Sequence, residues 1–209
     1  FTNSIPITYN TAATCPMINK FFKEIYPEKP ELLYEITAWL LTHKNRHEKA
    51  VLIAGPTARN GKSTLLKLFV QFLGEDNVST KSLATLTNNQ FASSSLFGKM
   101  ANISADIPNK HITNSAIFKT IVSGKDLVDA QYKGENSFQF INRAKLIFSC
   151  NDVPDSSDMG DGYIRKWMIL IFRKKFEGIN DDKFLDEKLQ DDDELSGLFN
   201  ECVKRYDKV

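Results

Sequence analysis

The chain has 209 residues, of which 42% are hydrophobic and 25% are charged, and its formal net charge is +1. This length and composition are typical of one globular domain with a sizeable core. The small net charge excludes a uniformly basic nucleic-acid-binding protein, so any such surface is confined to one part of the molecule. No apolar run approaches the ~20 residues of a membrane-spanning helix, and we expect neither a membrane span nor a signal peptide.

The first 49 residues are expected to form an irregular lead followed by helices. Apolar residues at helical spacing predict one helix over 17–25 and a second over 31–43. Pro27 and Pro30 separate the two, because proline interrupts a helix.

The pattern changes at residue 50, where short apolar runs begin to alternate with longer segments. The continuous run over 51–54 predicts a buried, parallel strand, and a helical segment over 61–72 follows it. Later apolar runs over 100–105, 144–149 and 167–172 predict further strands. The segments between them are long enough for helices or a hairpin, so the chain is expected to be an α/β layered domain.

Two other segments have a distinct character. Within 126–141, apolar residues on both sides of the polar stretch 132–136 predict a β-hairpin with a basic tip at Lys133. The tail over 181–209 is predicted to be helical, because the acids at 191–194 suit a helix N-terminus and the lysines and arginine after them suit its C-terminus.

The most specific local motif follows the first predicted strand. Gly55 and Gly61 flank five residues, and Lys62-Ser63-Thr64 comes directly after them. In a P-loop the backbone N–H groups and the helix N-terminus hold phosphate oxygens, the lysine neutralises the β- and γ-phosphates, and the next hydroxyl ligates Mg²⁺. The usual motif has four residues between the glycines, and a turn that binds no ligand is the alternative. The residues expected to contact the nucleotide are Gly55, Asn60, Gly61, Lys62, Ser63 and Thr64.

Further parts of an ATPase follow at the ends of later predicted strands. Asp106 is the candidate Mg²⁺ ligand together with Ser63, although Ala105 before it leaves only one acid there. Asn151 follows the next strand and is a candidate for orienting water or for contacting the γ-phosphate. Arg165 precedes the last strand, and a guanidinium stabilises charge on a transferring phosphoryl group. The alternatives are a strand-end turn residue for Asp106 and a surface charge for Arg165, and Asn151 gains its weight from its place in the order of motifs.

In this order the motifs resemble those of superfamily III helicases of the phage and plasmid primase type, relatives of the poxvirus primase-helicase. The resemblance covers nearly the whole chain, and its specificity comes from the ordered set, because each single motif is common. It departs from the family in the five-residue spacing of the phosphate loop and in the lone acid at the second motif. The segments that carry it are 5–10, 13–16, 55–64, 96–103, 106–108, 118–124, 130–133, 138–140, 145–154 and 162–167.

The resemblance implies an AAA+ type P-loop ATPase core with a central parallel sheet, preceded by a small helical region. It implies a homo-hexameric ring with ATP and Mg²⁺ bound between subunits. Lys62, Ser63, Asp106 and Asn151 would belong to the subunit that holds ATP, and Arg165 would be the arginine finger that acts on the neighbour's ATP.

The resemblance also implies a site that binds single-stranded DNA. Lys119, Gly124 and Lys133 match the family's additional motif, whose hairpin faces the central channel and holds single-stranded DNA. Family members translocate generally 3′ to 5′ and are often fused to a primase-polymerase. The chain opens at Phe1 rather than Met and ends in a charged helical stretch, so both ends are expected to be cut points. We expect an ATP-dependent DNA helicase of phage or plasmid replication in the host cytoplasm. The expected parts are 1–49, a helical lead, 50–177, the AAA+ core, and 178–209, a truncated helical lid.

Two other functions compete with this interpretation. A ring scaffold would bind nucleotide and DNA but hydrolyse slowly, because of the irregular phosphate loop and the lone Asp106. A small-molecule P-loop kinase would usually carry clustered arginines in a lid, whereas the six arginines here are scattered and a hairpin insertion has no role in a kinase.

Overall fold

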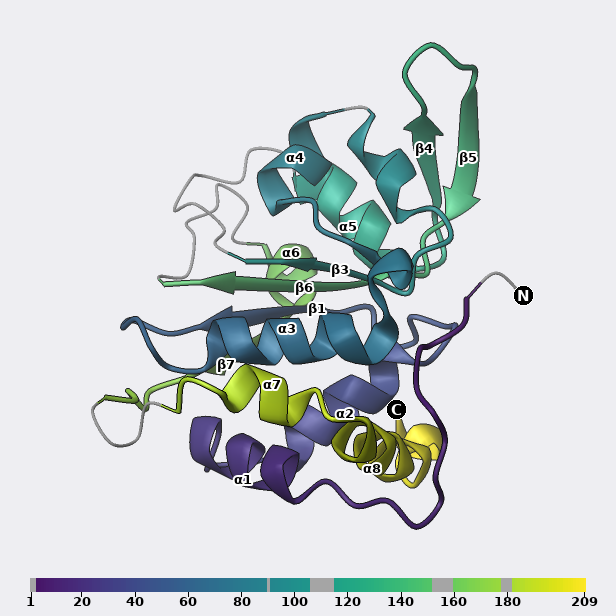
Figure 1. Ribbon diagram of the computed structural model, residues 1–209. Coiled ribbons are helices and arrows are strands. Elements are labelled where there is room, and N and C mark those ends of the chain that lie inside the picture. The colour runs from purple at the N-terminus through teal and green to yellow at the C-terminus, as the bar shows by residue number, and fades with distance from the viewer. Residues whose placement is uncertain (1–2, 90, 106–114, 152–159, 178–181) are drawn as a thin grey trace.

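The computed structural model describes residues 3–89, 91–105, 115–151, 160–177 and 182–209. These residues form three layers, in which a parallel sheet lies between two groups of helices (Figure 1). The expected α/β class with a central parallel sheet is therefore confirmed.

The central sheet has five strands, and every neighbouring pair is parallel. Across the sheet they follow one another as β2 (Val78–Ser79), β3 (Ala101–Ser104), β6 (Lys145–Cys150), β1 (Ala50–Ala54) and β7 (Trp167–Ile171). All residues of β1 are buried, because β1 has strands on both sides and helices on both faces. The sequence predicted all of these strands except β2, whose two residues are too few to show a pattern.

In the first helical layer, α3 lies against one face of the sheet, and the other helices lie on the far side of α3 (Figure 1). The second predicted helix ends at residue 40 rather than 43, because Leu41 and Thr42 donate i→i−3 hydrogen bonds to Ala38 and Trp39, which tighten the last turn. The helices of this layer are α1 (Pro16–Ile25), α2 (Glu31–Leu40), α3 (Lys62–Leu73), α7 (Leu185–Leu189) and α8 (Asp192–Val203), with short 3₁₀ turns η1 (Glu75–Asn77) and η4 (Tyr206–Lys208).

The N-terminal lead and the C-terminal helices pack together, although the whole sheet lies between them in sequence. The Glu194 carboxylate of α8 accepts hydrogen bonds from the backbone N–H groups of Met17 and Ile18, both at 3.0 Å. A carboxylate at this position pairs with backbone N–H groups that have no partner within the first turn of α1, and it suits the positive end of the helix dipole. Gly197 allows the close approach, because a Cβ there would lie 2.3 Å from the carbonyl carbon of Thr14.

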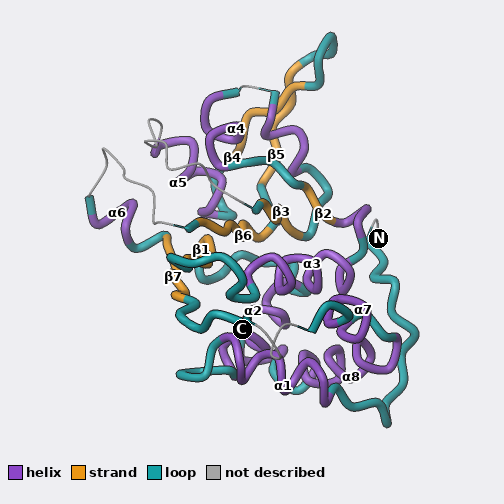
Figure 2. Tube along the Cα trace, turned by 60° about the vertical axis from the view of Figure 1, so that its left-hand side comes forward, coloured by secondary structure: helices purple, strands orange, loops and turns teal. Residues whose placement is uncertain are grey.

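The second helical layer covers the opposite face of the sheet, and a two-stranded hairpin projects from it (Figures 1 and 2). In the hairpin, antiparallel pairing runs from Leu127 opposite Ile141 to Gln131 opposite Ser137. The predicted hairpin is confirmed. The elements of this layer are α4 (Leu83–Asn88), η2 (Ala92–Leu96), α5 (Ser115–Ser123), α6 (Asp161–Ile164) and the hairpin strands β4 (Leu127–Gln131) and β5 (Ser137–Ile141).

Two hydrophobic cores lie on the two faces of the sheet. Successive side chains of a strand point to opposite faces, so Val51 and Ile53 of β1 pack with the α3 layer, and Leu52 packs with the α5 layer. Within the described part of the chain, no helix combines the length and apolarity that crossing a membrane requires.

Candidate functional site

The loop over 55–61, which we call the phosphate loop after its predicted role, joins the carboxyl end of β1 to the first turn of α3. The Lys62 side chain is 6% exposed and turns back into the loop. Its Nζ donates to the Gly55 carbonyl at 3.1 Å and to Asn60 Oδ1 at 3.0 Å, and it lies 3.4 Å from the Thr57 carbonyl. The loop therefore holds an ammonium group at its centre, where a phosphate oxygen would replace a carbonyl as its partner.

The Asn60 side chain links two other residues of the loop by hydrogen bonds. It is buried, and its Nδ2 donates to the Thr57 carbonyl at 2.6 Å while its Oδ1 accepts from Lys62. Arg59 has a φ of 60° and Gly61 has a φ of 85°, so two residues of the loop are left-handed. The left-handed backbone at these two residues accommodates the five residues between Gly55 and Gly61. The Arg59 carbonyl is held by the N–H of Phe176 at 2.8 Å.

The start of α3 has the features of an anion site. No side chain caps this helix, whose N-cap is Gly61, and Ser63 is exposed in its first turn. Thr57 Oγ1 is buried and has no hydrogen-bond partner among the described residues. A buried hydroxyl without a partner is costly unless a ligand satisfies it, so the loop fits a phosphate group.

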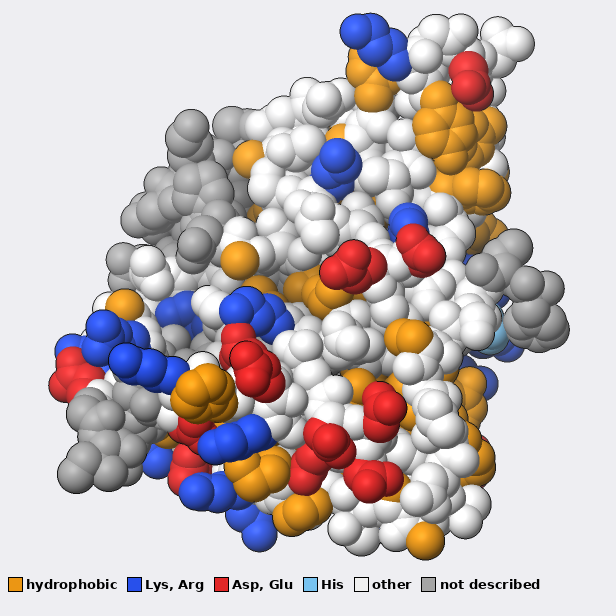
Figure 3. All heavy atoms as spheres, in the orientation of Figure 1, with side chains coloured by type: hydrophobic (Ala, Val, Ile, Leu, Met, Phe, Trp, Pro, Cys, Tyr) orange, Lys and Arg blue, Asp and Glu red, His pale blue; other side chains and the backbone are white. Residues whose placement is uncertain are grey.

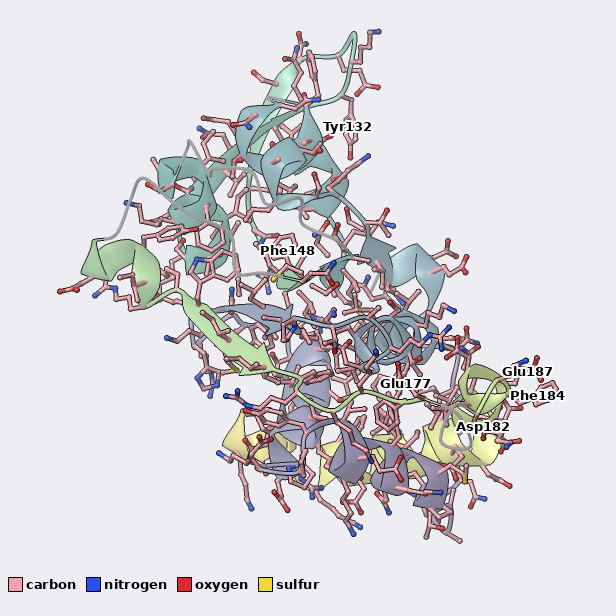
Figure 4. The ribbon with its side chains drawn as sticks, turned by 90° about the vertical axis from the view of Figure 1, so that its left-hand side faces the viewer. Tyr132, Phe148, Glu177, Asp182, Phe184 and Glu187 are labelled. Atoms are coloured by element: carbon pink, nitrogen blue, oxygen red, sulfur yellow. The ribbon has the colours of Figure 1, made fainter. Side chains whose placement is uncertain are left out.

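A cavity of about 720 Å³ adjoins the loop, with Gly61 and Thr64 in its wall. Its volume lies within the range of ordinary small-molecule sites. The other walls come from α1 and from residues within 174–176 and 182–186, segments for which the sequence suggested no ligand contact. Figure 4 labels Asp182 and Phe184 beside this cavity, at the end of the molecule away from Tyr132. The side chains from those walls are Met17, Lys20, Phe21, Glu24, Lys174, Phe176, Asp182, Lys183, Phe184, Leu185 and Asp186.

Asn151 lies beside the phosphate loop, because it follows β6, the neighbour of β1. Cys150 pairs with Ala54, and the Cys150 carbonyl accepts from the N–H of Gly55 at 3.2 Å. Asn151 is exposed at this edge. Asp106, the expected acid, lies outside the described residues. Within those residues, no group of three or more His, Cys, Asp or Glu side chains is placed to hold a metal ion.

Arg165 lies at the amino ends of the strands, opposite the carboxyl ends where Lys62 and Asn151 lie. It follows α6 and precedes β7, and the carbonyl of its neighbour Lys166 accepts from the N–H of Ala50, at the amino end of β1. Arg165 is exposed, and its guanidinium forms no ion pair with any described residue. The structure therefore separates Arg165 from Lys62 and Asn151, which lie together at the carboxyl edge.

Glu48 joins this edge to the base of the hairpin. Its carboxylate forms salt bridges with both Lys125 and Lys166. The hydrogen bonds from Lys125 and Lys166 lower the pKa of Glu48 to about 2. The sequence contained no signal for this connection, since the three residues are far apart along the chain.

The two predicted DNA-contacting lysines occupy different places. Lys133 is exposed at the hairpin tip, next to Gly134, whose φ of 85° suits the turn. Lys119 lies half-buried on α5, outside the hairpin. The hairpin tip is thus the more accessible of the two basic positions.

A protein-family model described as a family of unknown function (DUF5906) matches residues 53–166. No curated protein matches the chain. Among solved structures, an apo form of the NrS-1 C-terminal region is 14% identical at a TM-score of 0.73, covering 92% of this chain and 47% of that one. JCV helicase with a bound small molecule is 14% identical at a TM-score of 0.53, covering 88% of this chain and 52% of that one. This chain therefore spans about half the length of the solved chains it matches, and the likeness shows a helicase-like fold.

Proposed function

The chain belongs to the family of unknown function DUF5906, and we propose that it is the ATP-hydrolysing motor domain of a DNA helicase of the superfamily III type. One observation carries the proposal: the Lys62 ammonium is buried in a loop at the carboxyl end of the central strand, bonded to Gly55 and Asn60. A lysine in this environment is suited to a polyphosphate, because the loop already orients its charge.

In this proposal each residue of the carboxyl edge has a separate task. Lys62 neutralises the β- and γ-phosphates, and Asn151 orients the attacking water. Ser63 and Asp106 would hold Mg²⁺, which neutralises phosphate charge when bound. The nucleoside occupies the adjoining cavity of about 720 Å³. The buried Thr57 hydroxyl supports a ligand in the loop, because it has no partner among the described residues.

Arg165 completes the site of a neighbouring copy. Its place at the amino edge of the sheet, away from the phosphate loop, supports action on a second subunit's ATP rather than on its own. We therefore propose a ring, a homo-hexamer in the full-length protein, with a composite site at each subunit contact.

The hairpin is the proposed grip on single-stranded DNA, with Lys133 at its tip and Lys119 on the helix before it. The remaining elements of the proposal are the association with a primase-polymerase, the host cytoplasm as location, and the division into 1–49, 50–177 and 178–209. The Glu194 cap supports one refinement: the first and last of these parts pack as one helical layer.

Steady-state ATP hydrolysis, measured with and without single-stranded DNA, tests the proposal. The parent is expected to turn over ATP faster with DNA, and Lys62→Ala is expected to abolish turnover and weaken nucleotide binding. Lys204→Ala is the matched control, because this exposed lysine follows α8 and does not line the cavity beside the loop. Normal turnover in Lys62→Ala would discard the phosphate-loop assignment. A parent that binds ATP and DNA without turnover would favour the ring scaffold.

A further inference from the structure

One face of the hairpin, together with Phe97 at the end of η2, forms a continuous row of aromatic rings. Tyr132 stacks on Phe138 with 5.4 Å between ring centroids, and Phe138 meets Phe97 edge to face at 5.3 Å. Phe97 also meets Phe140 at 5.4 Å. The two outer rings are exposed, at 43% for Tyr132 and 53% for Phe97. We call these four residues the aromatic strip; Figure 3 shows hydrophobic side chains gathered along the hairpin, and Figure 4 labels Tyr132 on it.

At the base of the hairpin the aromatic strip meets a groove of about 320 Å³. Phe97 and Phe140 form part of its wall, and Lys99, Arg143 and His43 supply basic groups. No aspartate or glutamate is among the described residues that line the groove. Lys99 donates to a backbone carbonyl, and within the described part of the chain neither Lys99 nor Arg143 forms an ion pair. The positive charges of Lys99 and Arg143 in the groove are therefore not neutralised by a carboxylate of the described residues.

The opposite face of the hairpin differs in chemistry. Asp129 and Gln139 lie opposite each other there, and the Gln139 amide donates to the Asp129 carboxylate at 2.8 Å. Leu127 and Ile141 are the exposed apolar pair of this face. It has no aromatic ring and it carries an acid, so an anionic ligand with flat rings suits only the first face.

We infer that the aromatic strip and its groove bind single-stranded nucleic acid, with unpaired bases stacked on Phe97 and Tyr132 and phosphates beside Lys99 and Arg143. This inference rests on the proposed function and adds base contacts to the lysine at the hairpin tip. Aromatic side chains next to cations are the usual combination for single strands, because every base has a face to stack and every linkage has a charge. The bases of a duplex are already stacked on each other and cannot occupy such rings.

Fluorescence anisotropy with two oligonucleotides of equal length, oligo(dT) and a fully abasic strand, tests this inference. Phe97→Ala is expected to weaken oligo(dT) binding by about 5- to 150-fold, the usual loss for one stacked base. The same variant should bind the abasic strand like the parent, and Phe97→Trp should retain affinity for oligo(dT). Leu127→Ala is the matched control, because Leu127 is 57% exposed on the other face of the same hairpin.

Arg143→Gln tests the groove independently of the rings. It should weaken binding of both strands and lower the magnitude of the salt dependence by about 0.7 in the log–log slope, as expected for one lost phosphate contact on a single strand. Thermal unfolding of each variant checks that the fold is retained.

The outcomes separate this inference from the proposed function. Parent-like oligo(dT) binding by both Phe97→Ala and Arg143→Gln would overturn the inference while leaving a DNA-binding motor intact. Equal losses of Phe97→Ala on the two strands would also overturn it, because stacking requires bases. Unchanged DNA affinity with reduced self-association would assign the aromatic strip to a contact between copies instead. A parent that binds neither strand would remove the proposed function as well.

Discussion

Lys62 and Arg165 lie at opposite ends of the same parallel sheet. Strands β1 and β7 pair in register from Ala50 opposite Trp167 to Ala54 opposite Ile171, so Lys62 follows the carboxyl ends and Arg165 precedes the amino ends. A strand of five residues spans about 16 Å at ~3.3 Å per residue. An arginine side chain does not extend that far, so Arg165 cannot reach a phosphate beside Lys62 of its own chain.

Mixing two inactive variants tests this separation. Lys62→Ala and Arg165→Ala should each lose ATP turnover, and loss of an arginine finger lowers turnover by about 10³- to 10⁵-fold. After mixing in equal amounts, about a quarter of the contacts in a random ring would combine an intact Lys62 with an intact Arg165. Steady-state hydrolysis should then recover in part. No recovery, with assembly confirmed by light scattering, would contradict action between subunits.

Lys133→Ala should weaken binding to single-stranded DNA while sparing ATP binding. The exposed ammonium at the hairpin tip is suited to a phosphate, and losing one such contact should lower the salt dependence by about 0.7 in the log–log slope. Anisotropy titrations at several salt concentrations measure both effects. Lys204→Ala should leave them unchanged, and an unaltered affinity in Lys133→Ala would place the hairpin tip away from the DNA.

Lys145 gives a pH-dependent contribution to stability. Its side chain is fully buried, and its ammonium donates to the carbonyls of Thr42 and Arg143. Burial, with a smaller contribution from the charge of Arg143, lowers the pKa of Lys145 to about 8, from 10.5 for an exposed lysine. Between these values the unfolded chain binds more protons than the folded one, so the free energy of unfolding rises with pH.

Lys145→Met removes this titration. Relative to the variant, the parent should gain up to about 3 kcal/mol of unfolding free energy as the pH rises from 8 to 10.5, at 1.36 kcal/mol for each unit of pKa difference. Below pH 8 the two profiles should run parallel, because the lysine is charged in both states. Urea unfolding across this range measures the difference, and parallel profiles throughout would contradict the lowered pKa.

Gly197→Ala should destabilise the packing of the N-terminal lead on α8. The added Cβ would lie 2.3 Å from the Thr14 carbonyl carbon and 2.6 Å from the Cys15 nitrogen, and these backbone atoms cannot yield as a flexible side chain would. Overpacking of this kind costs about 1–3 kcal/mol. Gly162→Ala is the control, because a Cβ there has no heavy atom within 4 Å. Equal unfolding midpoints for the two variants would argue against the close contact.

Local patterns in the sequence determined the strands that form the centre of the sheet, the glycine-flanked loop between β1 and α3, and the hairpin. The continuous apolar run of β1 and the Gly61-Lys62-Ser63 step each depend on neighbouring residues, so periodicity and turn chemistry were sufficient for them. The alternation around Lys133 predicted the hairpin for the same reason. The two-residue strand β2 and the end of α2 were missed, because tertiary contacts and the final turn decide them.

Only the tertiary structure decided which distant residues meet. Glu48 bridges Lys125 and Lys166, and Glu194 caps α1, because folding brings together segments that no spacing in the sequence relates. The aromatic strip likewise depends on Phe97 packing against the hairpin from a separate element. The separation of Lys62 from Arg165 follows from strand order and direction, which a one-dimensional pattern of apolar runs does not specify.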